Sequence, residues 1–415
     1  MGPIPRTRII VVDFLYKDEL MMEDVLLEVK SFLKKEEYNI IATRRIMHEN
    51  PELSMNEVET VRRIANELES IGIPYKIIDQ IGIIADINAD KEGRRILLRA
   101  DIDALPIQEL NDISYKSRTD GVMHACGHDA HIAMLLGACK ALWHIKERLD
   151  GAIRFVFQPG EETGQGALKM IEAGVLDGVN AVMGLHINSA VPKGVVYCPP
   201  GEMMAASDSI YVEFEGQKGH GARPNEGIDA IVMGSAFVTN AQSIISRELS
   251  PLESAVVTFG TFHAGEARNI IADKAIINGT VRTFNIGCRE FIEQALRRYV
   301  KNIASMYRGK YTFNYETSTP PLINNSQCAE LLYSTLDALD EPVRINKEGK
   351  KTGSEDFAYY MHETGVPGVF AFLGARSKKP ETHFNHHTGR FNIDESALVT
   401  GALIHTMYAY NYLKS

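Results

Sequence analysis

The chain has 415 residues, of which 45% are hydrophobic and 24% are charged, and its net charge is −10. This composition is typical of a globular protein with a large core, and we expect two domains. The acidic charge, with no basic run interleaved with aromatic residues and no apolar stretch near the roughly 20 residues of a membrane span, argues against nucleic-acid and membrane partners.

Residues 1–37 are predicted to form an N-terminal extension, in which a short apolar run precedes a charged amphipathic helix. The run Arg8–Tyr16 is not followed by a small-residue cleavage site, so we do not interpret it as a signal peptide. The five cysteines are odd in number and widely spread, which predicts no disulfide framework and a cytoplasmic location.

From residue 38 onward, helices and strands alternate. Apolar spacings of three and four predict helices, which cover residues 57–68, 130–145 and 166–173. Continuous apolar runs predict buried strands, which cover residues 82–87, 95–100, 152–157 and 181–185. This alternation predicts an α/β fold, in which a mainly parallel sheet is flanked by helices on both faces. Functional sites in such sheets lie beyond the carboxyl ends of the strands.

The pattern changes near residue 203, and the segment 209–215 alternates apolar and polar residues with period two. The elements that follow have a β-α-β-β-α-β order, which is typical of a small ferredoxin-like α+β domain. The α/β pattern resumes after Pro320-Pro321. We therefore predict a catalytic domain made of residues 38–202 and 318–415, and an inserted domain made of residues 203–317.

The densest set of candidate metal ligands is the stretch His124-Ala125-Cys126-Gly127-His128-Asp129-Ala130-His131. It contains a glycine and precedes a predicted helix, so its side chains can converge. We take Cys126 and His128 as candidate ligands of a divalent metal, and expect the other polar members to orient the site. A Cys/His nucleophile pair is the alternative.

Further candidates follow two predicted strands. Glu161 and Glu162 come after the strand 152–157, where one carboxylate can bind a metal while the other accepts a proton from water. A solvated acidic loop is the alternative. His186 ends the strand 181–185, where it is either a metal ligand or a core histidine.

Asp101 and Asp103 end the strand 95–100, and residues two apart face the same side. A carboxylate behind a metal-binding histidine fixes the tautomer of the ring, although a turn cap is the alternative. A last ligand is expected from the histidines near the C-terminus, and spacing alone does not choose among them: His383, His386 and His387.

Three residues of the predicted inserted domain are candidates for substrate contact. His220 lies between two glycines, which suggests a close approach of the backbone to another group, or a loop histidine without a role. Asn269 and Arg282 flank a predicted strand, and an arginine can bind a substrate carboxylate in a bidentate manner.

Taken in order, these motifs resemble the amidohydrolase branch of the aminoacylase/carboxypeptidase metallopeptidases, which carry two co-catalytic metals. The resemblance runs from about Ile41 to the C-terminus. It includes motifs outside the candidate residues, such as His48-Glu49-Asn50-Pro51-Glu52-Leu53 and Gly353-Ser354-Glu355-Asp356-Phe357. Relatives in this branch include indole-3-acetyl-amino-acid hydrolases, hippurate hydrolases, and N-acetyldiaminopimelate and N-acetylcysteine deacetylases.

The resemblance implies a role for each matching position. The implied metal ligands are Cys126, His128, Glu162, His186 and His387. The family pattern for the last ligand is His, a small residue, Pro, any residue and an aromatic residue. The segment His387–Phe391 fits it with Gly389 in place of proline, which favours His387 over His386.

The remaining roles implied by the resemblance concern catalysis. Glu161 corresponds to the catalytic base, and we add Asp103 to the catalytic set. The inserted domain is expected to form a homodimer, in which a histidine matching His220 reaches the partner's active site. Asn269 and Arg282 match substrate-contacting positions.

We therefore expect a metal-dependent amidohydrolase that acts on N-acyl-L-amino acids. Two divalent ions are expected, with zinc or manganese favoured and cobalt or nickel as further candidates. A dipeptidase or carboxypeptidase of the same architecture is one alternative. A non-catalytic metal-binding protein is another, although the intact Glu161 argues against it.

Overall fold

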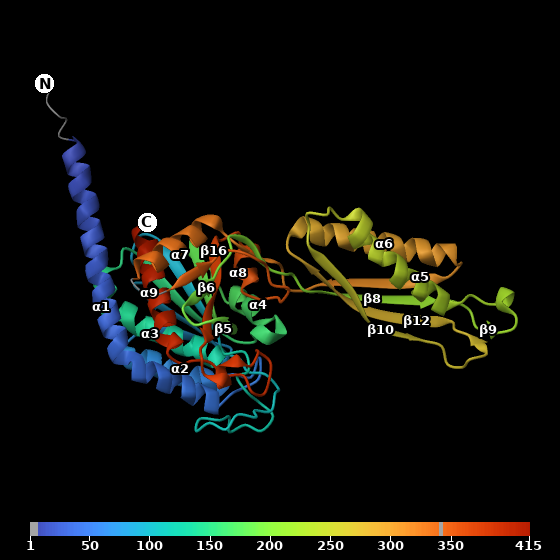
Figure 1. Cartoon of the computed structure of the whole chain (residues 1–415), viewed down its shortest axis with the longest axis horizontal. Coiled ribbons are helices and arrows are strands. Elements are labelled where there is room, and N and C mark those ends of the chain that lie inside the picture. The colour runs from blue at the N-terminus through green and yellow to red at the C-terminus, as the bar shows by residue number, and fades with distance from the viewer. Residues whose placement is uncertain (1–6, 340–342) are drawn as a thin grey trace. The chain divides into compact units, whose positions relative to one another are not determined.

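The computed structural model describes residues 7–339 and 343–415, so residues 1–6 of the predicted extension lie outside the described residues. The chain divides into two compact units (Figure 1). The first consists of Met1–Cys198, Asn325–Glu348 and Glu363–Ser415. The second consists of Pro199–Asn324 and Gly349–His362, and it contains the whole of the predicted inserted segment.

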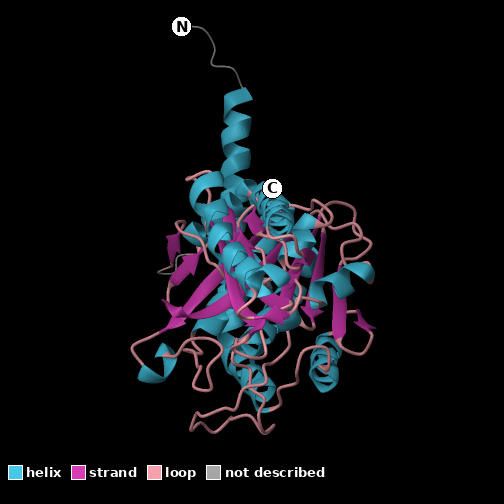
Figure 2. Ribbon diagram, turned by 90° about the vertical axis from the view of Figure 1, so that its right-hand side faces the viewer, coloured by secondary structure: helices cyan, strands magenta, loops and turns pink. Residues whose placement is uncertain are grey.

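The first unit is built on an eight-stranded sheet. Its strands, in spatial order, are β1 (Tyr75–Ile78), β2 (Gly82–Ile87), β4 (Ala152–Gln158), β3 (Arg95–Asp101), β5 (Ala181–Pro192), β16 (Gly368–Arg376), β6 (Val195–Tyr197) and β15 (Arg344–Asn346). The central strands β4, β3, β5 and β16 are parallel neighbours, whereas β1 and β2 are antiparallel. The mainly parallel sheet is confirmed, and Figure 2 distinguishes the strands from the helices around them.

Helices cover both faces of this sheet. On one face, α1 (Thr7–Glu49), α3 (His128–His144) and α9 (Ala397–Lys414) pack against one another, and α3 and α9 also contact β3. Phe155 of β4 is fully buried in the core on that side. Arg154 points to the other face, where it donates to Val175 O at 2.9 Å, just beyond α4 (Gly166–Glu172). The remaining helices of this unit are α2 (Val58–Ile71) and α7 (Ser326–Ala338).

Helix α1 continues through the predicted boundary at residues 37 and 38 without a break. Three of its side chains upstream of that point, Val25, Val29 and Leu33, are fully buried in the core of the first unit. From Val25 onward the helix is therefore part of the packed structure. Within the described residues, no helix has both the length and the apolar character needed to cross a membrane.

The second unit contains a four-stranded antiparallel sheet with two helices. In chain order its main elements are β8 (Asp208–Glu215), α5 (Ala230–Ser243), β10 (Ala255–Ala264), β12 (Lys274–Thr283), α6 (Ile286–Met306) and β13 (Lys310–Thr317). The spatial order β10-β12-β8-β13 is that of a ferredoxin-like fold, which confirms the predicted β-α-β-β-α-β order. The smaller elements are β7 (Gly201–Met204), β9 (Gly219–His220), β11 (Ile270–Ile271), β14 (Leu322–Asn324) and α8 (Ala358–His362).

The contribution of α1 to the core can be measured with two leucines of that helix. Leu33 is fully buried, whereas Leu27 is 62% exposed. Replacing Leu33 with alanine should lower the free energy of unfolding by about 2–5 kcal/mol, because it leaves a cavity in the core. The control Leu27→Ala should change it by less than about 0.5 kcal/mol. Urea denaturation would contradict the assignment if both variants unfolded at the wild-type midpoint.

Candidate metal centre

Cys126 and His128 lie where the chain turns into α3. Gly127 between them has a φ of +90°, in the left-handed region that favours glycine. A Cβ atom on Gly127 would lie 2.5 Å from Ile187 Cγ2. Only glycine therefore fits this turn, which brings the Cys126 and His128 donor atoms within 4.8 Å of each other and of a donor atom of His186.

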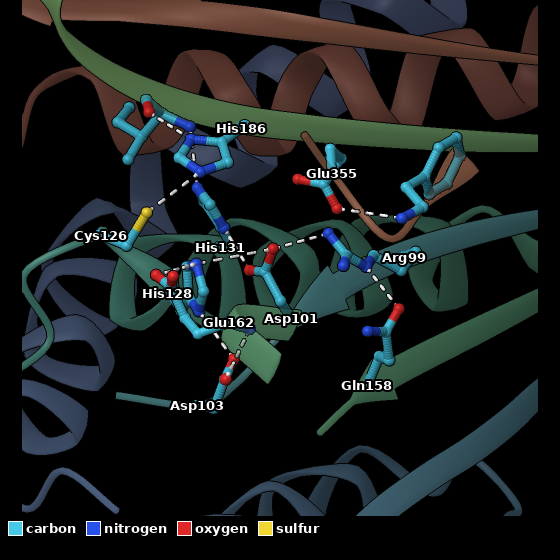
Figure 3. Close-up of polar contacts among 12 residues, drawn as sticks. Arg99, Asp101, Asp103, Cys126, His128, His131, Gln158, Glu162, His186 and Glu355 are labelled. Atoms are coloured by element: carbon cyan, nitrogen blue, oxygen red, sulfur yellow. Dashed lines mark hydrogen bonds and ion pairs between the residues drawn. The ribbon is translucent and has the colours of Figure 1, made fainter. Parts of the chain in front are cut away.

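His186 comes from β5, which continues beyond its predicted end because it goes on pairing with β16. Its pairing with β3 stops at Gly184, which lies opposite Arg99, so His186 lies two residues beyond the last β3–β5 pair although it is inside its own strand. His186 Nε2 lies 3.5 Å from Cys126 Sγ, and Nδ1 lies 2.5 Å from Ile187 O (Figure 3). A backbone carbonyl next to Nδ1 holds the proton there and leaves Nε2 for a metal.

Glu161 and Glu162 begin a 3-10 turn, Glu161–Thr163, that follows β4. Glu162 Oε1 lies 3.3 Å from His387 Nε2 and 3.9 Å from His128 Nε2. An oxygen of Glu161 lies within 4.8 Å of donor atoms of His128 and Glu162. Both carboxylates therefore reach the same cluster, as their position after a strand predicts.

His386 and His387 differ in their partners. His386 Nε2 accepts a hydrogen bond from Ser189 N at 3.1 Å, and Nδ1 lies 3.1 Å from Cys126 O, so both ring nitrogens are used within the protein. Burial lowers the pKa of His386 to about 3, which keeps the ring neutral. His387 Nε2 instead lies 3.3 Å from both Cys126 Sγ and Glu162 Oε1. This geometry favours His387 as the ligand.

Close packing explains the glycine at position 389, which replaces the proline of the family pattern. A Cβ atom there would lie 2.4 Å from Gln108 O, and Leu110 N donates to Gly389 O at 2.7 Å. Nearby, the Phe391 ring lies 4.6 Å from the His386 ring. The loop that carries the last candidate ligand is therefore held against the segment around residues 108–110.

The donor atoms form overlapping groups, and within each group they lie within 4.8 Å of one another. These groups are Cys126–His128–His186, Cys126–Glu162–His387 and His128–Glu161–Glu162. Two buried atoms, His128 Nε2 and Glu162 Oε1, have no hydrogen-bond partner among the described residues. Thiolate, imidazole and carboxylate donors at this spacing would suit transition-metal ions.

The charges around the cluster also favour a cation. Burial by itself lowers the pKa of His128, but the nearby Asp101 and Asp103 raise it to about 10. Burial, together with the charge of Glu162, raises the pKa of the Cys126 thiol well above its ordinary value. Both groups thus retain protons when no metal is bound. A metal cation would displace those protons and balance the carboxylates, so the residues fit a metal centre.

Asp103 and Asp101 form their hydrogen bonds with different histidines, although Asp101 Oδ2 also lies 3.8 Å from His128 Nε2. Asp103 Oδ1 lies 3.0 Å from His128 Nδ1, which places the proton on Nδ1 and directs Nε2 toward the cluster. Asp101 bonds to His131 Nδ1, and His131 Nε2 accepts from Ile187 N at 2.8 Å (Figure 3). Asp103 therefore orients a candidate ligand directly, whereas Asp101 acts through His131 on the backbone beside His186.

Arg44 and His48 of α1, for which the sequence motifs predict no role, form a buried network. Arg44 Nε and His48 Nδ1 each lie 2.8 Å from Asp129 Oδ2, and His48 Nε2 lies 3.1 Å from Glu109 Oε1. Asp129 directly follows His128, so the network connects α1 to the start of α3. The sequence feature that could have indicated this network is the spacing of four residues between Arg44 and His48, which places both side chains on one face of the helix.

His220, Asn269 and Arg282 belong to the second unit. Gly221 N donates to Asn269 O at 2.8 Å, so His220 and Asn269 are near neighbours within this unit. A Cβ atom on Gly221 would lie 3.1 Å from that oxygen, which explains the glycine after His220. Arg282 lies on β12, and its Nη1 is buried without a hydrogen-bond partner among the described residues.

Two curated relatives are similar over most of the chain. N-acetyl-L-cysteine deacetylase of Bacillus subtilis is 40% identical, over 88% of this chain and 85% of that protein. Thermostable carboxypeptidase 2 of Saccharolobus solfataricus is 36% identical, over 94% of this chain and 99% of that protein.

A solved structure and a family model agree with these relatives. The crystal structure of the Bacillus subtilis YXEP protein, a dinuclear metal binding peptidase from the M20 family, matches with a TM-score of 0.81 and 33% identity, over 92% of this chain and 99% of that one. Residues 97–411, which include all five candidate ligands, match the model of peptidase family M20/M25/M40. The chain therefore belongs to peptidase family M20/M25/M40, and it is a metal-dependent hydrolase that acts on amide bonds.

Proposed function

We propose that this enzyme is a di-metal amidohydrolase that removes the acyl group from N-acyl-L-amino acids. The observation that carries the proposal is the position of Glu161 beside Glu162 in the turn after β4, next to donor atoms of His128 and His387. Glu162 completes a ligand set, and its neighbour serves as the base that hydrolysis requires.

The reaction uses the Glu161 carboxylate twice, first as a base and then as an acid. Bound ions would supply a Lewis acid and lower the pKa of a water molecule, with Cys126, His128, Glu162, His186 and His387 as their ligands. Glu161 takes one proton from that water, and the water oxygen attacks the amide carbonyl carbon. The carbon–nitrogen bond then breaks, and Glu161 gives the same proton to the leaving amine. Asp103 supports the reaction by holding His128 in one tautomer.

The substrate class is supported by the relatives and by Arg282. One relative, 40% identical, is an N-acetyl-L-cysteine deacetylase. The buried, unpartnered Nη1 of Arg282 is suited to a substrate carboxylate, and Asn269 to a carbonyl oxygen. A carboxypeptidase or dipeptidase activity is the second candidate, since a carboxypeptidase is 36% identical over nearly the whole chain. The cysteine in the ligand set favours zinc, with manganese, cobalt or nickel as alternatives.

The proposal includes a cytoplasmic homodimer that forms through the second unit. β10 is one of the two edge strands of the four-stranded sheet, and its Val256 and Phe262 are exposed. An edge strand with exposed apolar side chains is suited to pairing with a second copy. In such a dimer, His220 of one copy would donate to the oxygen that becomes negatively charged during the attack in the other copy.

The choice of His387 over His386 predicts different metal contents for two variants. His387→Ala should lower the bound zinc from two ions to one per chain after dialysis, because it removes a ligand. His386→Gln should retain two ions, because the amide can still contact Ser189 N. Mass-spectrometric metal analysis of folded protein measures both. Loss of metal in His386→Gln, with two ions kept in His387→Ala, would reverse the assignment.

The base assignment predicts that Glu161→Gln keeps its metal and loses turnover. We expect kcat for N-acetyl-amino acids to fall about 10²–10⁴-fold, because the amide cannot take the proton from water. The assay should include acetyl-, benzoyl- and indoleacetyl-amino acids beside dipeptides, with zinc or manganese present. Wild-type activity in Glu161→Gln would exclude Glu161 as the base. Faster cleavage of dipeptides than of all acyl-amino acids by the wild type would favour the second candidate.

A further inference from the structure

The turn that carries Glu161 and Glu162 is held on both sides by buried carboxyl groups. On one side, Asp103 Oδ2 accepts a hydrogen bond from Glu162 N at 3.1 Å. On the other side, Glu57 Oε1 accepts one from Gly160 N at 2.8 Å. These two amides flank Glu161 in the sequence. The two carboxyl groups therefore fix the backbone on either side of the proposed base.

Glu57 is fully buried, and it contacts the turn closely. Gly160 has a φ of +58°, and a Cβ atom on it would lie 2.5 Å from Met55 Sδ. The same short segment also supports the other carboxyl group, because Ser54 Oγ donates to Asp103 Oδ2 at 2.6 Å. Residues 54–57 thus supply one of the two carboxyl groups that hold the turn, Glu57, and contact the other, Asp103.

The cost of burying Glu57 suggests a role beyond stability. Its Oε1 accepts from Gly160 N and from Met55 N at 2.9 Å, but Oε2 is buried without a hydrogen-bond partner among the described residues. Burial, followed by the charge of Asp103, raises the pKa of Glu57 to about 7. A buried carboxyl oxygen without a partner destabilises the fold, so the benefit of this residue must lie elsewhere.

We propose that Glu57 is a positioning residue, which holds Gly160 N so that the Glu161 and Glu162 carboxylates point into the metal cluster. The inference rests on the roles proposed above for Glu161 and Glu162. It requires a hydrogen-bond acceptor at position 57, whereas a negative charge there is not required. Glutamine keeps that acceptor and alanine removes it.

The test compares Glu57→Ala with Glu57→Gln. In Glu57→Ala we expect kcat for an N-acetyl-amino acid and the affinity of the metal-free protein for zinc each to fall about 10–100-fold, the usual effect of losing a residue that orients a metal site. KM should stay within about twofold, because the proposed role of Glu57 concerns the metal cluster and the base rather than substrate binding. Glu57→Gln should stay within about threefold of the wild type in all three quantities, since one hydrogen-bond acceptor replaces another.

Glu52→Ala is the matched control from the same segment. The Glu52 carboxylate accepts from Thr60 N at 2.7 Å and from Glu59 N at 3.2 Å, so it supports the start of α2 rather than the turn that carries Glu161. This variant should lower the unfolding temperature while kcat and zinc affinity stay at wild-type values. A merely structural effect of Glu57 would make Glu57→Ala behave like this control.

Two outcomes would overturn the proposal: wild-type kcat and zinc affinity in Glu57→Ala, or a tenfold or larger loss in Glu57→Gln. The second outcome is decisive even if Glu57→Ala does not fold. Zinc titration by calorimetry does not depend on turnover. If the wild type hydrolysed no N-acyl-amino acid, the proposed function would fail, and the titration would still decide the role of Glu57.

Discussion

The side chain of Asp103 connects three parts of the site. Its Oδ1 lies 3.0 Å from His128 Nδ1, and its Oδ2 accepts from Ser54 Oγ at 2.6 Å and Glu162 N at 3.1 Å. Burial by itself raises the pKa of Asp103, but the hydrogen bond to His128 and the charge of that ring together outweigh this effect. The pKa is therefore below its ordinary value, and the group is ionised. A ligand at the start of α3 and the turn after β4 therefore share one fixed anion. The arrangement of the candidate metal centre depends on this contact.

Much of the site could be predicted because it follows from the sheet. β3, β4, β5 and β16 are parallel neighbours, so polar residues at or after their carboxyl ends gather at one edge. Residue type after a buried strand was a sufficient signal to place Asp103, Glu162 and His186 at this edge, whereas the choice of Glu162 over Glu161 as a ligand came from the family resemblance. The choice of His387 over His386 needed more than spacing, because it depends on which ring nitrogens are already occupied. The partners of His386, Ser189 N and Cys126 O, come from distant parts of the chain.

The predicted bounds of two elements, α1 and β5, differ from the structure for the same physical reason. The upstream part of α1 was predicted as an extension because its buried residues, such as Val29 and Leu33, are interspersed with charged residues in the sequence. Their packing partners are in α3, about a hundred residues further along the chain, and in α9, at the C-terminus. Likewise, β5 extends past its predicted end because β16 pairs with it. In both cases a contact between residues distant in sequence determines the extent of the element, and a local sequence pattern does not predict such a contact.

The central claim is that Cys126, His128, Glu162, His186 and His387 bind two metal ions. Anomalous diffraction from crystals grown with zinc, recorded on both sides of the zinc absorption edge, tests it most directly. We expect two peaks among these five side chains, about 3.5–4 Å apart, as in other two-metal hydrolytic sites. A single peak, or peaks only at surface residues outside this cluster, would contradict it.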